Sequence, residues 1–272
     1  MPCYSLFSKG TLTNSNLEFD VNTDILPKIS NANDIIDNLL PNKSTLYDYS
    51  VDDLIMFFDS VAAYWKKTDH PLKKYHFLGL SYLPIWLSKE NLIQITNISI
   101  RNNRQFLDRF QKNQPSDTFL LRAQPMGIIG HWIAGNIPIL GMISLVQGIL
   151  TKNLNIVRVS YSFGNILSQI LDSFNNVTYT NNNGKIISGS KIAKTISVIY
   201  YDKTDINFAN DLSKLVNVRV VWGGKDAVES ISDLKKNVDT TDIIFGPKYS
   251  LAIIDKSFLS EKKITQSIAQ KL

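Results

Sequence analysis

The segment Trp132–Pro138 carries an amide side chain at a point where the backbone can present free N–H groups. Gly135 permits a tight turn between an apolar strand and an apolar helix, and Pro138 suits the first turn of that helix, where its missing N–H costs nothing. Asn136 would then lie at the helix N-terminus. Two interpretations stay open: Asn136 caps the helix, or its amide donates to an oxyanion that develops during acyl transfer.

A second turn of the same kind follows Val220–Trp222, where Gly223 and Gly224 precede a helix. Two glycines let a phosphate or a flat ring approach the helix N-terminus, where N–H groups and the helix dipole favour an anion. The segment is not a G-x-G-x-x-G loop, and many strand-to-helix turns need glycine for steric reasons alone. This turn therefore indicates a nucleotide site only in combination with other residues.

Arg158 places a charge near the end of the otherwise apolar strand Asn155–Val159, and Ser160 follows that strand. A charge that is buried without a partner is strongly unfavourable, so Arg158 should reach a carboxylate or a ligand. A salt bridge to Asp202 or Asp226 would meet this requirement. A contact with a phosphate or a ribose would meet it equally well, and both alternatives stay open.

The remaining reactive side chains are weaker candidates. His131 lies inside the first strand beside Trp132, and a lone core histidine is more often structural than catalytic. His70 and His76 have no Cys or carboxylate at metal-ligand spacing, so no metal site is expected. Cys3 lies in what we expect to be a flexible terminus, with no flanking base or helix start to lower its pKa.

The elements that must position these residues alternate between short apolar strands and amphipathic helices. The expected strands are Gly127–Ile133, Asn155–Val159, Ile196–Tyr201, Arg219–Trp222 and Asp242–Phe245. The expected helices are Ile137–Leu150, Asn165–Phe174, Phe208–Val216 and Asp226–Leu234. This alternation predicts an α/β fold with a parallel sheet, whose ligands bind at the carboxyl ends of the strands. We therefore expect Asn136, Arg158 and Gly223 to converge at one edge of the sheet.

The chain before Pro115 has a different pattern. Residues 1–48 are rich in Asn, Asp, Ser and Thr, and we expect them to wrap the surface as short strands and loops. Helices are expected at Tyr49–Lys67, Tyr75–Trp86 and Lys89–Phe110. Further on, the Asn-rich stretch Asn175–Asn183 is expected to be a solvent loop.

Composition argues against several classes of function. The 29 basic residues give a net charge of +5, but no basic run is longer than a Lys-Lys pair, so no nucleic-acid binding is expected. A single cysteine allows no intrachain disulfide and suits a reducing, cytoplasmic location. No segment reaches the roughly 18 consecutive apolar residues of a membrane span, and residues 1–30 lack the pattern of a secretory signal.

Taken together, these segments resemble the acyl-CoA reductase family typified by the long-chain fatty-acid reductase of bacterial bioluminescence (LuxC), a branch of the aldehyde dehydrogenase superfamily. The resemblance covers Leu121–Asp255 well, and its strongest element is PMGIIGHWIAGNIPIL (125–140) continuing through LTKNLNIVRVS (150–160), with VWGGKDAV (221–228) as a further likeness. It implies an aldehyde-dehydrogenase-like nucleotide-binding domain with an open parallel sheet, preceded by a mostly helical region. The implied boundaries are 1–118 for the helical region, 119–255 for the Rossmann-like nucleotide-binding domain and 256–272 for the start of a catalytic domain.

The resemblance also implies roles for individual residues. Asn136 occupies the place of the Asn that donates its amide to the thiohemiacetal oxygen, and Arg158 that of a basic residue at the adenosine ribose. The implied cofactor is NADP or NAD, bound by Ile133, Ala134, Gly135, Arg158, Ser160, Trp222, Gly223 and Gly224. Ile244 stands where many aldehyde dehydrogenases have a general-base Glu, which favours acyl exchange with a thiol over hydrolysis.

The function implied by the resemblance is NAD(P)H-dependent reduction of a fatty acyl thioester, acyl-CoA or acyl-protein, to an aldehyde through an acyl-cysteine. The nucleophilic Cys that this chemistry needs is not in the chain, so we expect the chain alone to bind nucleotide weakly and to catalyse nothing. The full-length enzyme is expected to form a homo-oligomer or to engage acyl-transfer partner subunits. Two other functions stay open: a non-catalytic interaction subunit with the same fold, and another nucleotide-binding enzyme.

Overall fold

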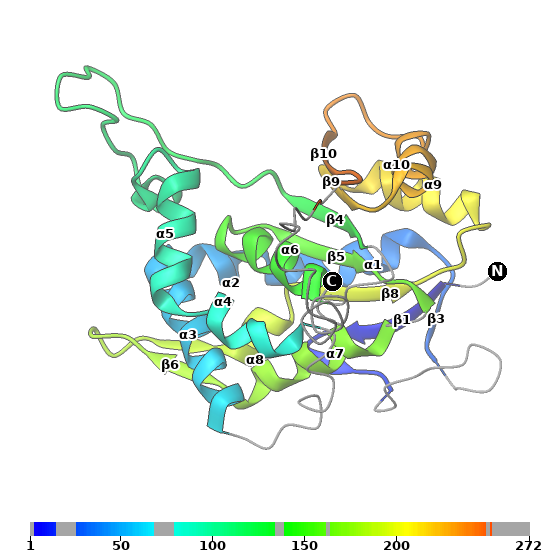
Figure 1. The fold of residues 1–272 in the computed structure, drawn as a ribbon, viewed down its shortest axis with the longest axis horizontal. Coiled ribbons are helices and arrows are strands. Elements are labelled where there is room, and N and C mark those ends of the chain that lie inside the picture. Colours follow the sequence, from blue (N-terminus) through cyan, green and yellow to red (C-terminus); the bar gives the residue numbers. More distant parts are fainter. Residues whose placement is uncertain are drawn as a thin grey trace, which may run out of the picture.

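The computed structural model describes residues 3–14, 26–67, 79–133, 139–161, 164–248 and 251. Its main sheet has the strand order β10-β9-β4-β5-β8-β1-β2, and β3 pairs with β1 (Figure 1). The strands of this sheet are β1 (Cys3–Ser8), β2 (Thr11–Leu12), β3 (Lys28–Ile29), β4 (Ile128–Trp132), β5 (Leu154–Arg158), β8 (Ile196–Tyr200), β9 (Val218–Trp222) and β10 (Thr241–Phe245). A separate hairpin consists of β6 (Thr178–Thr180) and β7 (Ile186–Ser188).

Helices surround this sheet. They are α1 (Ala32–Leu39), α2 (Lys43–Asp48), α3 (Val51–Lys67), α4 (Leu83–Trp86), α5 (Lys89–Ser99), α6 (Ile139–Leu150), α7 (Gly164–Asp172), α8 (Gly189–Ala193), α9 (Ile206–Leu215) and α10 (Lys225–Ser232). Short 3-10 turns lie between some of them: η1 (Leu40–Asn42), η3 (Leu80–Tyr82), η4 (Arg104–Leu107) and η6 (Ser173–Asn176). No helix in the described ranges is both long enough and apolar enough to cross a membrane.

The five strands β10, β9, β4, β5 and β8 are parallel, which confirms the expected parallel sheet. Their carboxyl ends are in register, because Trp132 pairs with Arg158 on one side and with Val221 on the other. After β4 the chain proceeds to β5 and β8 on one side, and then crosses to β9 and β10 on the other side. The strand order therefore reverses between β4 and β9, and open α/β sheets bind ligands in the crevice at such a switch point.

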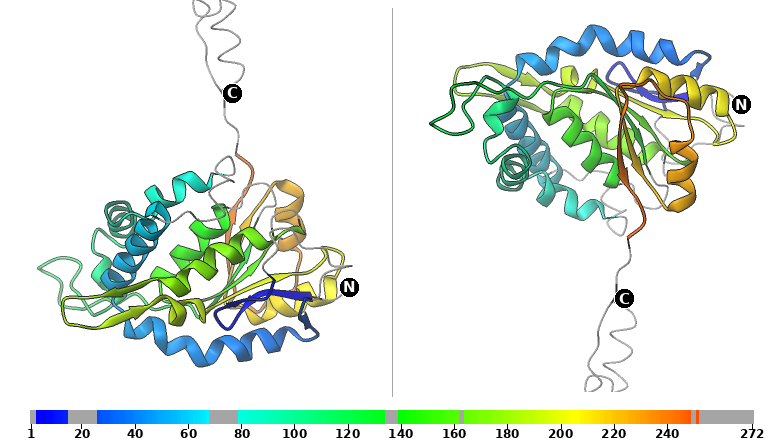
Figure 2. Two further views of the ribbon diagram at one scale, coloured as in Figure 1. Left: turned by 90° about the horizontal axis from the view of Figure 1, so that it is seen from below. Right: turned by 90° about the horizontal axis from the view of Figure 1, so that it is seen from above.

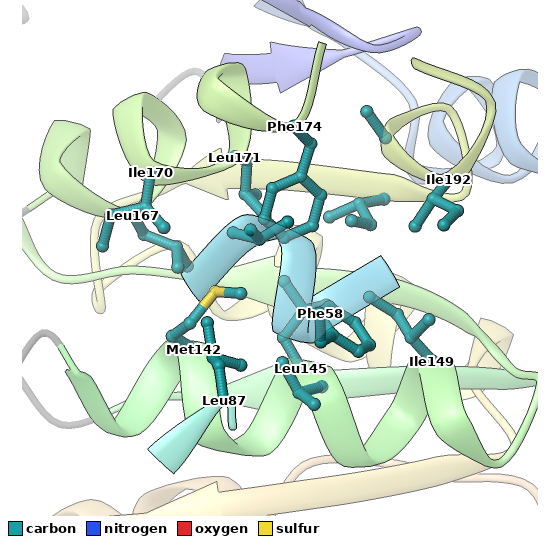
Figure 3. Close-up of a cluster of buried hydrophobic side chains, with 14 of the residues drawn as sticks. Phe58, Leu87, Met142, Leu145, Ile149, Leu167, Ile170, Leu171, Phe174 and Ile192 are labelled. Atoms are coloured by element: carbon teal, nitrogen blue, oxygen red, sulfur yellow. The ribbon is translucent and has the colours of Figure 1, made fainter. Parts of the chain in front are cut away.

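Helices cover both faces of the sheet (Figure 2). On one face, α6 and α7 pack against the strands and against α3, and the apolar residues of α6 interdigitate with those of α7 (Figure 3). Phe57 and Phe58 of α3 meet Phe174 edge to face, with ring centroids 5.5 and 6.0 Å from Phe174. On the other face, α1 and α9 pack together over a second apolar cluster that includes Trp132 and Tyr201. We call these the α6 face and the α9 face.

The expectation for residues 1–48 is wrong in two respects. β1 is not a surface strand: five of its six residues are buried, and it lies inside the main sheet, where it pairs antiparallel with β8 on one side and with the short strands β2 and β3 on the other. The run Cys3–Ser8 has no clean polar and apolar alternation because helices cover both of its faces. Residues 32–48 form the helices α1 and α2 instead of loops, and Ala32, Ile35 and Leu39 of α1 are buried at helical spacing.

Other expected elements differ in their ends. The helix expected at 89–110 stops at Ser99, because Arg101 and Asn102 have positive φ angles that interrupt a helix before η4. The stretch expected as a solvent loop at 175–183 contains strand β6, which pairs with β7. Of the helix expected at 75–86, the residues up to 78 lie outside the described ranges, and the rest form η3 and α4.

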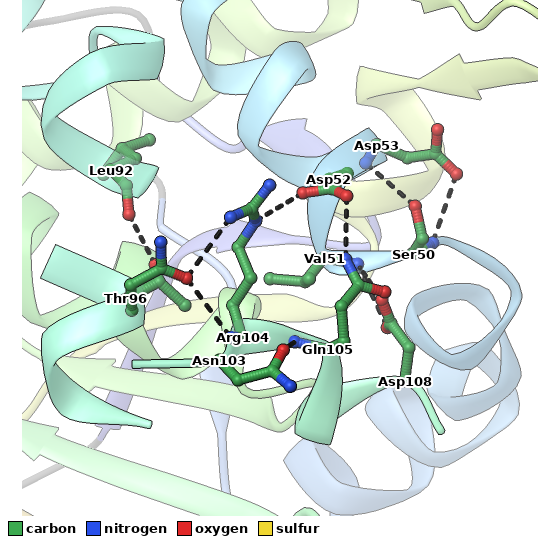
Figure 4. A network of polar contacts seen from close by, with 11 residues as sticks. Ser50, Val51, Asp52, Asp53, Leu92, Thr96, Asn103, Arg104, Gln105 and Asp108 are labelled. Atoms are coloured by element: carbon green, nitrogen blue, oxygen red, sulfur yellow. Dashed lines mark hydrogen bonds and ion pairs between the residues drawn. The ribbon is translucent and has the colours of Figure 1, made fainter. Parts of the chain in front are cut away.

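A polar network fixes the start of α3 (Figure 4). The Ser50 hydroxyl accepts from the backbone N–H of Asp53, and the Asp53 carboxylate accepts from the N–H of Ser50, which is a reciprocal cap. Both Asp108 oxygens accept from the N–H of Val51 at 3.0 Å, and Asp108 also pairs with the buried Lys152 at 2.5 Å. These contacts connect α3 to the turn before β5.

Candidate functional site

The predicted site segments end neighbouring strands at one edge of the sheet. Arg158 is the last residue of β5, Trp222 is the last residue of β9, and Ile133 directly follows β4 between them. The backbone N–H of Ile133 donates to the Arg158 carbonyl at 3.2 Å, which continues the ladder past the end of β4. The N–H of Gly223 donates to the Phe245 carbonyl, also at 3.2 Å. The structure thus brings these segments together at the carboxyl edge.

Arg158 makes few contacts for a guanidinium. Its Nη2 donates to the carbonyl of Tyr201 at 3.1 Å, and its Cζ lies 5.2 Å from the centre of the Tyr201 ring. Within the described part of the chain it forms no salt bridge with Asp202 or Asp226, although the sequence left that alternative open. Its Nε is buried and has no hydrogen-bond partner among the described residues.

The Tyr201 ring packs against the guanidinium of Arg158, and the sequence analysis did not identify this residue. Its hydroxyl accepts from Nε1 of Trp132 at 2.8 Å, and burial raises its pKa to about 12, so the phenol stays neutral. A neutral ring under a guanidinium gives a favourable cation–π contact. The available signal was its position directly after a strand, since Tyr201 follows the end of β8.

Asp202 lies close to Arg158, but its side chain accepts hydrogen bonds from its own loop instead of pairing with the guanidinium. Its Oδ1 accepts from the backbone N–H of Thr204 at 2.9 Å and from the Thr204 hydroxyl at 2.6 Å. These two hydrogen bonds hold the pKa of Asp202 below its usual value, and the charge of Arg158 adds to the effect. Asp202 is therefore an ionised carboxylate beside Arg158 that leaves the guanidinium free for another partner.

Two further polar atoms at this edge are buried and without hydrogen-bond partners among the described residues: the Ser160 hydroxyl and Nε1 of Trp222. The Trp222 ring stacks on Phe245 of β10, with centroids 3.9 Å apart and planes 11° apart. This stack fixes the orientation of the indole. Sequence reasoning missed Phe245 as a site neighbour, although it too is the last residue of its strand.

The two glycines after β9 differ in what surrounds them. A Cβ on Gly223 would lie 2.8 Å from the Cβ of Ala227, so the fold itself needs a glycine there. A Cβ on Gly224 would meet nothing within 4 Å, so the space beside it is open. Asp226 already places a carboxylate in the first turn of α10, so the helix N-terminus alone is weak evidence for a bound phosphate.

The predicted site residues lie on both faces of the sheet. Arg158 pairs in register with Trp132 and contacts Tyr201, both of which pack in the cluster of the α9 face. Trp222 packs with Ile129 and Val220 on the α6 face. Because side chains alternate along a strand, these two assignments agree with the register. A ligand that touches both residues must therefore cross the carboxyl edge of the sheet.

The turn after β4 is only partly described. Ile133 is buried, and its side chain packs in the core of the α6 face near Gly141, so only its backbone can face a ligand. Ala134, Gly135 and Asn136 lie outside the described residues. Their roles, including the choice between a helix cap and an oxyanion donor for Asn136, stay predictions.

His131 is a structural residue, as its position inside a strand indicated. It is 1% exposed, its Nδ1 lies 2.7 Å from the Ser144 hydroxyl, and its Nε2 lies 3.0 Å from Oδ1 of Asn155. Burial lowers its pKa to about 4. The described residues contain no cluster of His, Cys, Asp and Glu that could hold a metal.

Cys3 does not lie in a flexible terminus, contrary to expectation. It is the first residue of β1 and is 1% exposed. Burial raises the pKa of its thiol far above the usual value, so it stays protonated. A surface hollow of about 660 Å³ lies beside it, between α1 and α9, with Lys28, Asp205 and Asp211 on its walls. This hollow lies next to β1, which is three strands away from β4 in the sheet order, so it is not at the switch point between β4 and β9.

Comparison with known proteins gives related sequences and related folds. The long-chain acyl-protein thioester reductase of Vibrio harveyi is 26% identical over 246 residues, which are 84% of this chain and 48% of that protein. The enzyme of the same name from Photorhabdus luminescens is 26% identical over 260 residues, 88% of this chain and 50% of that protein. The chain thus spans about half the length of the curated relatives it matches.

Among solved structures, glyceraldehyde-3-phosphate dehydrogenase GapN of Methanocaldococcus jannaschii, complexed with NADP, has a TM-score of 0.52 at 15% identity, over 85% of this chain and 50% of that one. The NADP-dependent enzyme of Bacillus halodurans has a TM-score of 0.54 at 10% identity, over 89% and 52%. These matches show an aldehyde-dehydrogenase-like fold. The family model "Acyl-CoA reductase (LuxC)" matches residues 46–271. With that match over most of its length, the chain belongs to the acyl-CoA reductase (LuxC) family.

Proposed function

We propose that this chain is the nucleotide-binding part of an enzyme that reduces a fatty acyl thioester to an aldehyde with NADPH or NADH. The dinucleotide would bind across the carboxyl edge of the sheet, at the switch between β4 and β9. The acyl group would be carried by a cysteine of the part of the protein that the family relatives have beyond the matched half. The thioester substrate is an acyl-protein or an acyl-CoA.

One observation carries this proposal: three buried polar groups at the ligand-binding edge have no partner among the described residues. They are Nε of Arg158, the Ser160 hydroxyl and Nε1 of Trp222. Buried polar groups nearly always have partners, because an unpaired one costs roughly 1 to 3 kcal/mol. All three can donate a hydrogen bond, as the phosphates and hydroxyls of a nucleotide require. Their position at a topological switch point agrees with this.

The distribution of these donors favours a dinucleotide over a mononucleotide. Arg158 and Tyr201 lie on the α9 face, whereas Trp222 lies on the α6 face. A long ligand that crosses the edge beside Gly224, where the space is open, can reach both faces. Arg158 would then hold a ribose or phosphate at the adenosine end. Trp222 and the turn 134–138 would lie toward the nicotinamide end.

The chemistry divides between the cofactor and the protein. A bound nicotinamide supplies the hydride. Asn136 would donate its amide to the oxygen of the tetrahedral intermediate, and Ile133, Ala134 and Gly135 would contact the cofactor through their backbone. Ile244 puts no carboxylate at the position where the resemblance implies a general base, so water attacking the thioester would not be activated there. This favours reduction over hydrolysis.

Nucleotide binding by the 272-residue chain tests the first half of the proposal. NADPH and NADH are titrated into the protein, and the quench of tryptophan fluorescence is followed with calorimetry as a second readout. Saturable 1:1 binding is expected, weakened at least tenfold in Arg158→Met. Lys214→Met is the matched control, because the exposed Lys214 side chain pairs, among the described residues, only with Asp211 at 3.2 Å and lies near the amino end of β9, away from the proposed site. Absence of binding would instead favour an interaction subunit that shares the fold.

Catalysis tests the second half and needs a protein that includes the proposed cysteine-bearing part. Asn136→Ala should lower kcat by about 100-fold with little change in KM, because an oxyanion donor acts mainly in the transition state. Acyl-CoA and acyl-protein thioesters are compared as substrates. If Asn136→Ala keeps its turnover and only destabilises the fold by about 1 kcal/mol, Asn136 is a helix cap.

A further inference from the structure

Helix α6 begins at Ile139, three residues after Asn136 in the chain, and its contacts with the sheet are almost entirely apolar. Nine of its twelve residues are buried, and apart from Ser144 these are aliphatic residues, methionine or glycine. Apolar packing is non-directional, so it resists separation of helix and sheet more than it resists sliding of one along the other. A directional contact is needed to fix the helix at one register.

Ser144 supplies such a contact through His131 of β4. Asn155 of β5 donates from Nδ2 to the Asn153 carbonyl at 2.6 Å, so its Oδ1 is the acceptor that faces His131. His131 must then donate from Nε2, which leaves Nδ1 to accept from the Ser144 hydroxyl at 2.7 Å. Each hydrogen bond in this series therefore has one assigned donor and one assigned acceptor. The series extends from the turn before β5, through Asn155 of β5 and His131 of β4, to the middle of α6.

Gly148 gives independent support for this arrangement. A Cβ at this position would lie 2.0 Å from Oδ1 of Asn155 and 3.5 Å from Nε2 of His131. Glycine at a helix interior costs about 1 kcal/mol relative to alanine. Here it allows α6 to approach the hydrogen bond between Asn155 and His131 closely. The helix therefore carries both a hydroxyl that joins the polar contacts and a gap that accommodates them.

Burial excludes a direct chemical role for these side chains. His131, Ser144 and Asn155 are 1%, 3% and 0% exposed, so no substrate reaches them. The low pKa of His131 keeps the ring neutral at ordinary pH, and only a neutral ring has a nitrogen lone pair for the Ser144 hydroxyl. The effect of this network must be exerted through the position of α6.

We propose that His131 is a positioning residue, which holds α6 at one register on the sheet. The inference rests on the proposed function, because that function gives residues 133–136 their roles at the cofactor and at the acyl oxygen, and α6 begins at Ile139, shortly after them in the chain. A displacement of about 1 Å in such a group can cost about 100-fold in rate. The hydrogen bonds of His131 would therefore help to keep these groups at the positions that the reaction needs.

The test compares four variants of the 272-residue chain. His131→Leu removes both hydrogen bonds, and Ser144→Ala removes one of them while favouring the helix. His131→Gln keeps one donor and one acceptor in place of the two ring nitrogens. Thr195→Val is the control: it removes the buried hydrogen bond from Thr195 Oγ1 to the Ile192 carbonyl, at the opposite, amino end of β8.

Hydrogen exchange of the backbone amides is the first measurement, made without nucleotide. Exchange in peptides covering 133–145 should rise at least tenfold in His131→Leu and Ser144→Ala, and return toward wild type in His131→Gln. Thr195→Val should change the exchange of this segment no more than that of the rest of the chain. A rise that is uniform along the chain in all variants would overturn the proposal, since it would show loss of global stability alone.

NADPH affinity is the second measurement, made well below the unfolding temperature of each variant. The dissociation constant should rise about tenfold in Ser144→Ala and stay within twofold of wild type in His131→Gln and Thr195→Val. If the wild-type chain binds no nucleotide, the proposed function fails, and the exchange measurement still decides whether His131 positions α6. If His131→Leu does not fold, Ser144→Ala carries both measurements.

Discussion

Arg158 and Arg219 lie on the same face of one sheet, yet their surroundings are opposite. Arg219 is 1% exposed, and its Nε and Nη2 donate to the two oxygens of Asp242 at 2.6 and 2.7 Å. Its Nη1 donates to the Ser213 hydroxyl and to the carbonyls of Ile231 and Leu234. Arg158 donates one hydrogen bond to a carbonyl and leaves its buried Nε without a partner among the described residues.

The difference between these two regions follows from position along the strands. Arg219 lies near the amino end of β9, where α9 and α10 close over it and provide acceptors for its N–H groups. Arg158 lies at the carboxyl end of β5, where ligands of parallel sheets bind. A guanidinium has five N–H donors, and the protein satisfies most of them at Arg219 and few of them at Arg158. The first region stabilises the fold, and the second retains capacity for a ligand.

The largest expected effect is on stability. Arg219→Met should lower the free energy of unfolding by about 3 kcal/mol, because it breaks a buried, bidentate ion pair and removes a donor from three other acceptors, although Asp242 keeps its ion pair with Lys236. Arg158→Met should lower it by less than about 1 kcal/mol, since few contacts are lost. Urea denaturation of both variants measures this. Equal losses in the two variants would contradict the comparison.

The next largest effect is expected from buried His131, which should make the free energy of unfolding depend on pH. The pKa of His131 is about 4 in the folded state against 6.5 ordinarily, so the unfolded chain binds more protons between these values. Stability should therefore fall as the pH falls through this window, by about 2 kcal/mol between pH 7 and pH 5 from this group.

Urea denaturation of the wild type and of His131→Gln at pH 7 and pH 5 isolates this contribution. The variant should lose about 2 kcal/mol less than the wild type on acidification, because the titrating group is absent. Parallel pH dependences in the two proteins would show that His131 does not contribute, and would place its pKa near the ordinary value.

The smallest expected effect concerns the two glycines after β9. Gly224→Ala should leave the free energy of unfolding within about 0.5 kcal/mol, because its Cβ would meet nothing, and should weaken NADPH binding several-fold by filling the space at the edge. Gly223→Ala should destabilise the fold by about 1 to 2 kcal/mol, because its Cβ would overlap that of Ala227. Thermal unfolding and nucleotide titration of both variants check this pair, and a loss of stability in Gly224→Ala would remove the argument for open space there.

The sequence by itself determined the parallel part of the fold. The five apolar runs from 127 to 245 appear as β4, β5, β8, β9 and β10, because hydrophobic periodicity and the alternation of strands with helices are local properties. The same local reading placed Arg158 and Trp222 at strand ends, where the structure has them. It missed β1 as a buried strand, because the burial of both its faces depends on pairing with β8, nearly 200 residues away along the chain.

Only the tertiary structure decided which polar residues are satisfied. In the sequence Arg219 begins an expected strand and Arg158 lies near the end of another, but this difference in position does not identify the partners of either guanidinium. Their partners come from Ser213, Ile231, Leu234 and Asp242 in one case and from Tyr201 in the other. The same holds for His131, whose role depends on α6 and β5 meeting around it. Hydrogen-bond partners are set by distance in space, so local sequence pattern cannot assign them.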